Sequence, residues 1–339
     1  MVWEALYSVE GNLYGIMDIL YAVIVVLGLV VFETIASIDN AIINADILST
    51  MSAWAKRWFL TWGLIIAVFG VRGVLPWLII WFSTPSLGPI GALTATFSDD
   101  ATAAAAIEAS APFLLLAGGM FMILLFLHWL MTEQKNCIVP GELALSKQGP
   151  WFYAVAAILL LVIVYFAVQI NPFLAVAAAA GFAIFFVMTG IRLFADKKSA
   201  ELEKEGSDPK AAKHSDLSKL ALLEVIDASF SIDGVVGAFA FTMSVPLILI
   251  GNGIGAFVVR EMTIRNLDTI RKFAYLKNGA MYSILCLGII MCAEAFGAHL
   301  PIWFAPLLTI CIVAVFLWLS IRKIKNNDFG VCVLEPKSE

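Results

Sequence analysis

Long apolar runs are the feature that most constrains the fold of this chain. About nine stretches are mostly apolar, and most reach the roughly 20 residues that a helix needs to cross a bilayer. Lipid offers no hydrogen bonds to the backbone, so spanning segments of this length have to be helical. The sequence therefore predicts an all-α, polytopic membrane protein with spans at 17–48, 58–82, 111–131, 151–170, 172–194, 219–244, 245–259, 278–296 and 301–321.

Composition agrees with an environment of lipid. Of 339 residues, 61% are hydrophobic and 14% are charged, and the mean hydropathy is +0.94. A typical soluble domain is about half apolar and about a quarter charged. The formal net charge of −5 also argues against a nucleic-acid-binding protein.

Lysine and arginine give the predicted spans an orientation. With the N-terminus outside, the cytoplasmic loops carry 20 of the 21 basic residues, and the remaining one, Arg72, lies inside the second span. The predicted external segment 83–110 contains acids but no Lys or Arg. Because cytoplasmic loops are enriched in Lys and Arg, we expect an external N-terminus and a cytoplasmic C-terminus in a bacterial inner (plasma) membrane.

A polar segment at 196–218 separates two membrane halves. It mixes acidic and basic residues and contains one glycine and one proline, which is typical of a flexible linker. A regulatory or partner-binding loop is the alternative. We predict a first half at 1–195 with spans one to five, a second half at 219–325 with spans six to nine, and a cytoplasmic tail at 326–339.

An acidic motif occurs twice inside the predicted spans. The first copy begins at Glu33 and ends at Asp39, and the second begins at Asp227 and ends at Asp233; both have the pattern acid-x3-Ser-Ile-Asp. The two copies lie in spans that run in opposite directions. This arrangement is the signature of an inverted-topology repeat, which places the substrate near the bilayer midplane between the halves.

Acids at this depth cost several kcal/mol unless they are paired or hydrated, so they usually have a function. The structural alternative is that they cap helices or pair with Arg72. Carboxylate, hydroxyl and amide oxygens are hard ligands that suit Mn²⁺, Ca²⁺ or Mg²⁺. We expect a divalent-cation site with the ligands Glu33, Asp39, Asn40, Asp227, Ser231 and Asp233.

Four further residues complete the predicted site. Ser37 and Asn252 are expected as additional ligands or orienting groups. Arg72 and Arg260 are expected as counter-ions that occupy the acids when metal is absent, although Arg260 is equally well explained as a cytoplasmic surface anchor.

The helices around the site are expected to be irregular. Six residues separate Glu33 from Asp39, about 240° around an ideal helix, so a straight helix cannot aim both at one site. The seventh span, 245–259, reaches only about 22 Å as a helix and contains glycines and Asn252. A half-span or broken helix is expected there.

Several ordered motifs resemble those of the TerC family of integral membrane proteins. They are the two acidic copies, Arg72, and the segment 251–279, which contains Gly-Asn, then Arg260, then Arg-Lys-Phe-Ala-Tyr-Leu-Lys-Asn-Gly. The sequence of the second acidic copy resembles that of a divergent branch of the TerC family. Gly234 stands where that family commonly has a polar residue, which removes one ligand.

The resemblance implies a function in metal export. The TerC family is named for tellurium resistance, and its members are implicated in manganese export, often in connection with metal loading of secreted enzymes. We therefore expect Mn²⁺ efflux, with Ca²⁺ or Mg²⁺ as other substrates, protons as a coupling ion and no organic cofactor. A membrane scaffold with a structural metal is the first alternative. An intramembrane enzyme is the second, but no HExxH, Ser/His pair or Walker lysine loop occurs.

Overall fold

The computed structural model describes most of the chain and confirms the all-helical membrane class. No strand occurs in the described part, and six of its helices are long and apolar enough to cross a membrane. They correspond to predicted spans one, three, four, five, eight and nine. The described residues are 2–37, 41, 44, 47–48, 51–63, 65–66, 70, 72–83, 85–97, 101–133, 135–139, 141–205, 212–270, 273 and 275–326. The six helical stretches are Asp18–Ala36, Glu108–Thr132, Gly149–Ile170, Pro172–Ala195, Leu276–Ala295 and Phe304–Lys325.

A central helix pair holds the bundle together. Helix α6 (Ala101–Thr132) packs along α12 (Leu276–Ala295) and along α9 (Pro172–Glu205). Glycines make the first contact close, because a Cβ on Gly119 would lie 2.8 Å from the carbonyl oxygen of Gly288. Conversely, a Cβ on Gly288 would lie 3.1 Å from the carbonyl oxygen of Gly119. Small residues of this kind let membrane helices approach closely.

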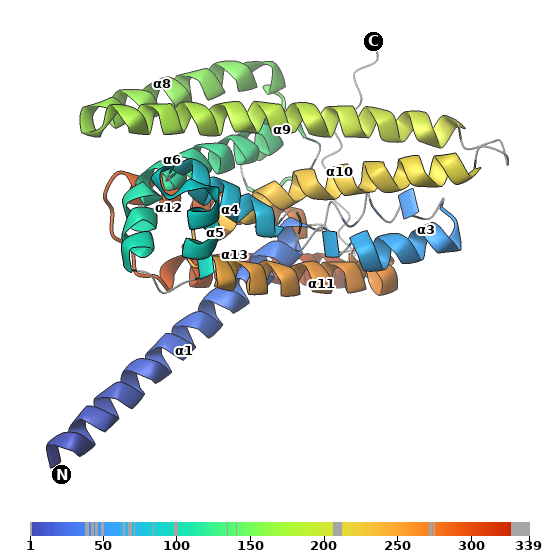
Figure 1. Cartoon of the computed structure of the whole chain (residues 1–339). Helices are drawn as coiled ribbons and strands as arrows, with labels where there is room; N and C mark the ends of the chain where they lie inside the picture. Colours follow the sequence, from blue (N-terminus) through green and yellow to red (C-terminus); the bar gives the residue numbers. More distant parts are fainter. Residues whose placement is uncertain are drawn as a thin grey trace.

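Helices α8 (Phe152–Ile170) and α9 form a hairpin along one side of the bundle (Figure 1). Helix α8 presents large apolar side chains outward, among them Leu161 at 69% and Tyr165 at 63% relative exposure. Such a surface is stable against lipid tails and would be unstable in water. The hairpin therefore has the surface that a membrane-facing element needs.

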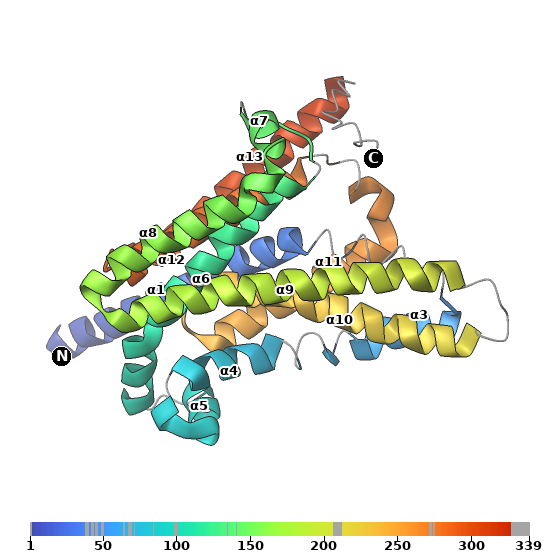
Figure 2. The ribbon, with the colours of Figure 1, turned by 90° about the horizontal axis from the view of Figure 1, so that it is seen from above.

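Helix α1 (Val2–Ala36) enters the bundle with its C-terminal part, while its N-terminal part projects away from it (Figures 1 and 2). There it packs on α11 (Val245–Ile270) and on α13 (Phe304–Asn326). Gly251 of α11 allows the close approach, since a Cβ there would lie 2.5 Å from Cβ of Leu29. Helix α1 is described to Ala36, and beyond it the Ala41 amide donates to the Ser37 carbonyl at 3.0 Å, as in a helix. Asp39 lies outside the described residues, so the expected break between Glu33 and Asp39 stays a prediction.

Helix α10 (Ala212–Ala238) returns beside α9 (Figure 2). Both helices extend into the predicted linker, because residues 196–205 and 212–218 are helical. Lys, Glu and Ala are strong helix formers, so a charged segment of this composition lengthens the helices.

The expectation of a broken helix at 245–259 is wrong, whereas that of a half-span stays a prediction. Helix α11 is one continuous helix of 26 residues. Its glycines serve close packing against α1, as Gly251 shows, and they do not interrupt the helix.

The region of predicted span two contains several short helical pieces. They are α3 (Ala53–Trp58), a π-helical turn at Phe59–Gly63 and α4 (Arg72–Ser83), followed by α5 (Gly88–Phe97). This region, α10 and α11 are not among the six apolar stretches. The nine-span count and the inverted repeat therefore stay predictions.

Candidate functional site

Glu33 is the most deeply buried of the predicted site acids that the structure describes. It lies on α1 with 0% exposure, and its Oε1 accepts a hydrogen bond from Ser37 Oγ at 2.8 Å. Two glycines make room for it. A Cβ on Gly234 of α10 would lie 2.2 Å from Glu33 Oε2, and a Cβ on Gly255 of α11 would lie 2.7 Å from Glu33 Cβ. The carboxylate therefore sits where α1, α10 and α11 meet.

Asp233 lies next to this carboxylate on α10. Its Oδ2 accepts a hydrogen bond from Arg192 Nη2 of α9 at 2.6 Å. Its Oδ1 is buried and has no hydrogen-bond partner among the described residues. Glu33 is close enough for its charge to act on Asp233. The two copies of the acidic motif thus contribute neighbouring buried carboxylates.

Asn252 supplies an amide to the same place. It is 0% exposed on α11, and its Nδ2 donates to the carbonyl oxygen of Gly234 at 3.4 Å. Within the described part of the chain its Oδ1 accepts no hydrogen bond. Because the amide nitrogen is held by α10, the amide oxygen is an acceptor available to a ligand at this junction.

Asp227 and Ser231 lie further down α10 and are both buried. Ser231 Oγ donates to the backbone carbonyl of Asp227 at 2.7 Å, one turn earlier in the same helix. This bond leaves the hydroxyl oxygen as an acceptor but directs the hydroxyl hydrogen to the backbone. The predicted roles of both residues as ligands stay predictions.

Another acid, Glu224, lies on α10 one turn before Asp227. A Cβ on Gly63 would lie 2.4 Å from Glu224 Oε1 and 3.6 Å from Arg260 Nη2. The Arg260 guanidinium also lies over the ring of Phe59, 4.3 Å from its centroid. Arg260 therefore lies beside Glu224, an acid that the predicted site does not include, and its role as a counter-ion of the predicted site acids stays a prediction.

Sequence reasoning missed Arg192 and Glu224. Arg192 stands at the end of an apolar run, where the positive-charge pattern counts it among the cytoplasmic residues, whereas α9 continues past it to Glu205. Glu224 lies three residues before Asp227, on the same face of α10, and that spacing was the available signal.

Other predicted site residues are not placed. Asp39 and Asn40 lie outside the described residues, and Arg72 begins α4 but its side chain is not described. Among the His, Cys, Asp and Glu residues that the structure describes, no group of three could hold a metal ion. The described part of the site is therefore two carboxylates and one amide oxygen beside an arginine.

The segment that resembles the TerC motif at 273–279 has a structural explanation here. The Tyr275 amide donates to Ser320 Oγ at 3.1 Å, and Lys277 Nζ donates to Glu133 Oε2 at 2.7 Å. Asn278 Nδ2 donates to a carbonyl of the loop after α6 at 2.9 Å. These bonds fix the start of α12 on α13 and on the segment that follows α6.

One family model matches most of the chain. Its description is "Protein of unknown function (DUF475)", and the match covers residues 38–327. No curated protein and no solved structure matches the chain.

Proposed function

We propose that this chain, which belongs to the DUF475 family, is a membrane transporter that exports a divalent cation, with Mn²⁺ ahead of Ca²⁺ or Mg²⁺. The observation that carries the proposal is the pair Glu33 and Asp233. They come from the two copies of one motif, in helices far apart in the sequence, and are buried side by side at one helix junction. Burying two acids together is costly unless a cation is recruited to them.

Helix contacts support an inverted repeat behind this pair. A two-fold axis relating spans one to three to spans six to eight would exchange α1 with α10, α4 with α11, and α6 with α12. The contact of α1 with α11 then has its counterpart in that of α10 with α4, and α6 meets α12. The reciprocal glycine contact between α6 and α12 is compatible with such an axis.

Span two and span seven, which the proposed two-fold axis would exchange, share a further sequence motif. Span two contains Phe-Gly-Val-Arg at 69–72, and α11 contains Phe-Val-Val-Arg at 257–260. Arg260 lies beside Glu224. Under the proposed two-fold, Arg72 would take the corresponding place next to α1.

Arg192 gives the proposed transporter a resting state. With no metal bound, its guanidinium neutralises Asp233. A divalent cation would be bound by Glu33, Asp233 and the Asn252 amide oxygen, all of them hard ligands, and would displace the arginine. The choice of Mn²⁺ rests on the resemblance to the TerC family. Protons are the proposed coupling ions, because carboxylates must be deprotonated to bind metal.

Mn²⁺ flux in proteoliposomes tests the proposal. The purified chain should carry Mn²⁺ to a dye enclosed in the vesicles, and Asp233→Asn and Glu33→Gln should abolish the flux. Ser37→Ala should reduce it about tenfold, the order of loss when a group that orients a metal ligand is removed. Asp18→Asn is the control, because Asp18 is an exposed acid on the same helix as Glu33.

Two outcomes would overturn the transporter. One is a wild-type chain that binds Mn²⁺ but moves none, which favours the scaffold. The other is normal flux in Asp233→Asn.

A further inference from the structure

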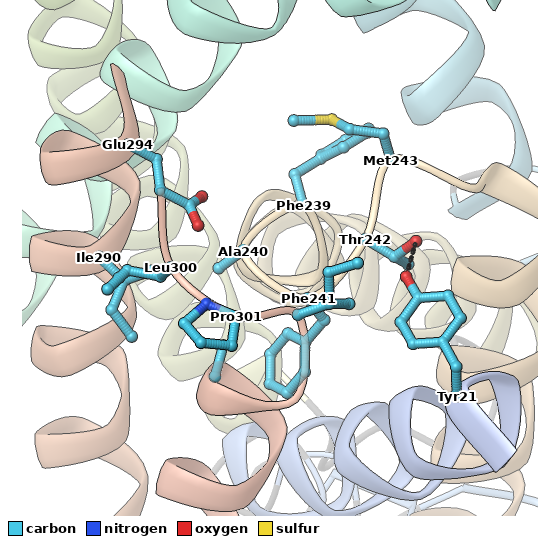
Figure 3. A pocket seen from close by; sticks show the side chains of 12 residues that line it. Tyr21, Phe239, Ala240, Phe241, Thr242, Met243, Ile290, Glu294, Leu300 and Pro301 are labelled. Atoms are coloured by element: carbon cyan, nitrogen blue, oxygen red, sulfur yellow. Dashed lines mark hydrogen bonds between the residues drawn. The ribbon is translucent and has the colours of Figure 1, made fainter. Parts of the chain in front are cut away.

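A cavity of about 250 Å³, here called the turn pocket, lies between the turn after α10 and the loop that joins α12 to α13. Figure 3 shows its lining, with the carboxylate of Glu294 from α12 pointing toward the turn. Apart from Tyr21 and Thr242, the other described residues that line the pocket are apolar. The pocket is therefore an apolar cavity with one acid in its wall.

The polar atoms of the turn are already used within the protein. Thr242 Oγ1 accepts hydrogen bonds from the Tyr21 hydroxyl at 3.2 Å and from the Ser244 amide at 3.1 Å. Phe241, next to Thr242, is only 3% exposed. The turn is therefore held in a fixed position, and Glu294 is the lining residue that offers oxygen atoms to a ligand.

The charge of Glu294 is not balanced within the pocket. In the described part of the chain its carboxylate forms no hydrogen bond and no ion pair. His299 is close enough for its charge to act on Glu294, but it is exposed and does not line the pocket. The described lining also contains no Lys or Arg. A negative pocket without a cation of its own is complementary to a positively charged ligand.

The pocket lies where two membrane-crossing helices end. Glu294 is the last residue but one of the apolar stretch Leu276–Ala295, and the following stretch begins at Phe304. Between them, Ile302 and Trp303 are 59% and 52% exposed. Exposed tryptophan of this kind is typical of the membrane–water interface. The ligand that the bilayer presents at this level is a phospholipid headgroup.

We propose that the turn pocket binds the ammonium group of phosphatidylethanolamine. The Glu294 carboxylate accepts a charge-assisted hydrogen bond from the ammonium group, and the apolar lining contacts the methylene groups beside it. A divalent cation takes six or more oxygen ligands, so one carboxylate among apolar side chains suits an organic cation instead. The lipid phosphate stays in water at the mouth of the pocket.

This lipid site depends neither on metal transport nor on the orientation of the chain. Helix α12 ends at the headgroups of one leaflet in either orientation. A bound headgroup there contacts the turn after α10 and the end of α12, so it links the two helices at the membrane surface.

Native mass spectrometry of the full chain, titrated with phosphatidylethanolamine and phosphatidylglycerol of the same acyl chains, tests the site. Wild type should bind the first phosphatidylethanolamine about tenfold more tightly, the effect of one hydrogen bond to a charged group. Glu294→Gln should remove this preference, and Glu294→Asp should retain most of it. Asp18→Asn should leave it unchanged, because Asp18 is an exposed acid one turn from Tyr21 that does not line the pocket.

Ile302 provides a second, matched pair of variants. It lines the pocket and is exposed, so a polar side chain is tolerated there. Ile302→Lys brings an ammonium group to the pocket and should remove the preference by competing with the headgroup. Ile302→Gln has no charge and should retain the preference.

Equal affinity of wild type for the two lipids overturns the site, and so does a preference that persists in Glu294→Gln or that Asp18→Asn removes. Displacement of the lipid by millimolar free ethanolamine indicates a site for a soluble amine and overturns the lipid as the occupant. Loss of the preference in Glu294→Gln supports the site, even where proteoliposomes show no Mn²⁺ flux. Should that variant fail to fold, persistence of the preference in Ile302→Lys overturns the site, and its loss there with retention in Ile302→Gln supports it.

Discussion

The Arg192 guanidinium on α9 donates to the Asp233 carboxylate on α10 at 2.6 Å, and side-chain exposures of 19% and 10% keep the pair largely out of solvent. Helix α9 corresponds to predicted span five, so it belongs to neither copy of the proposed repeat. The cation that neutralises Asp233 therefore comes from a helix outside the proposed repeat. A counter-ion on an independent helix can leave the acid without disturbing the junction of α1, α10 and α11.

The first prediction concerns removal of the two charges of this pair, first one and then both. Arg192→Gln should lower the stability of the purified chain by about 3–5 kcal/mol, because it leaves a buried carboxylate without its cation. Adding Asp233→Asn should restore most of that stability, since an amide pair carries no net charge to bury. Thermal unfolding in detergent, monitored by size-exclusion chromatography, measures both effects.

Arg192→Lys is the control, because it keeps the charge and should lose less. Equal melting temperatures for Arg192→Gln and wild type would show that the ion pair contributes nothing to the fold.

Burial of the acids was predictable from the sequence, but their partners were not. Glu33, Asp227 and Asp233 stand inside apolar runs, which indicates burial directly. Arg192 stands at the end of such a run, where an arginine extending to the membrane surface gives the same pattern. Only the packing of α9 on α10 distinguishes the two.

Gly234 shows a second limit of sequence reasoning. The sequence indicates only that a ligand is missing where the TerC family commonly has a polar residue. In the structure a Cβ on Gly234 would lie 2.2 Å from Glu33 Oε2, so only a glycine leaves room for the carboxylate there. The lost side chain makes space for an acid from the other half, and that relationship requires the three-dimensional arrangement.

Hydropathy predicted best the helices that face lipid. Helix α8 has mainly exposed apolar side chains and is confirmed almost residue for residue. Helices α10 and α11 carry acids, basic residues and glycines, because they pack against protein as well. A polar side chain is tolerated there when a neighbouring helix satisfies it.

Glycine substitutions on α9 provide a matched pair for the second prediction. A Cβ on Gly181 would lie 2.1 Å from the backbone carbonyl oxygen of Ala117 on α6, whereas one on Gly190 would meet nothing within 4 Å. Gly181→Ala should therefore force α6 and α9 apart and cost about 1–3 kcal/mol or more. Gly190→Ala should be neutral or stabilise the chain by up to about 1 kcal/mol, through helix propensity.

Melting temperatures of the two variants in the same detergent check the contact of α6 with α9. A Gly181→Ala variant as stable as Gly190→Ala would contradict the close approach of these helices.

The third prediction concerns the orientation of the chain. Six lysines occur between residues 197 and 219, whereas 83–110 contains no Lys or Arg. Because cytoplasmic loops are enriched in Lys and Arg, we predict that 200–215 is cytoplasmic and that 86–108 is external.

Ser86→Cys and Ser207→Cys test this orientation, because each replaces a serine by a cysteine in a background without the five native cysteines. A membrane-impermeant maleimide should label Ser86→Cys in intact cells, and Ser207→Cys only after permeabilisation. Labelling of Ser207→Cys in intact cells would reverse the orientation of α9 and α10. The proposed direction of export would then reverse as well.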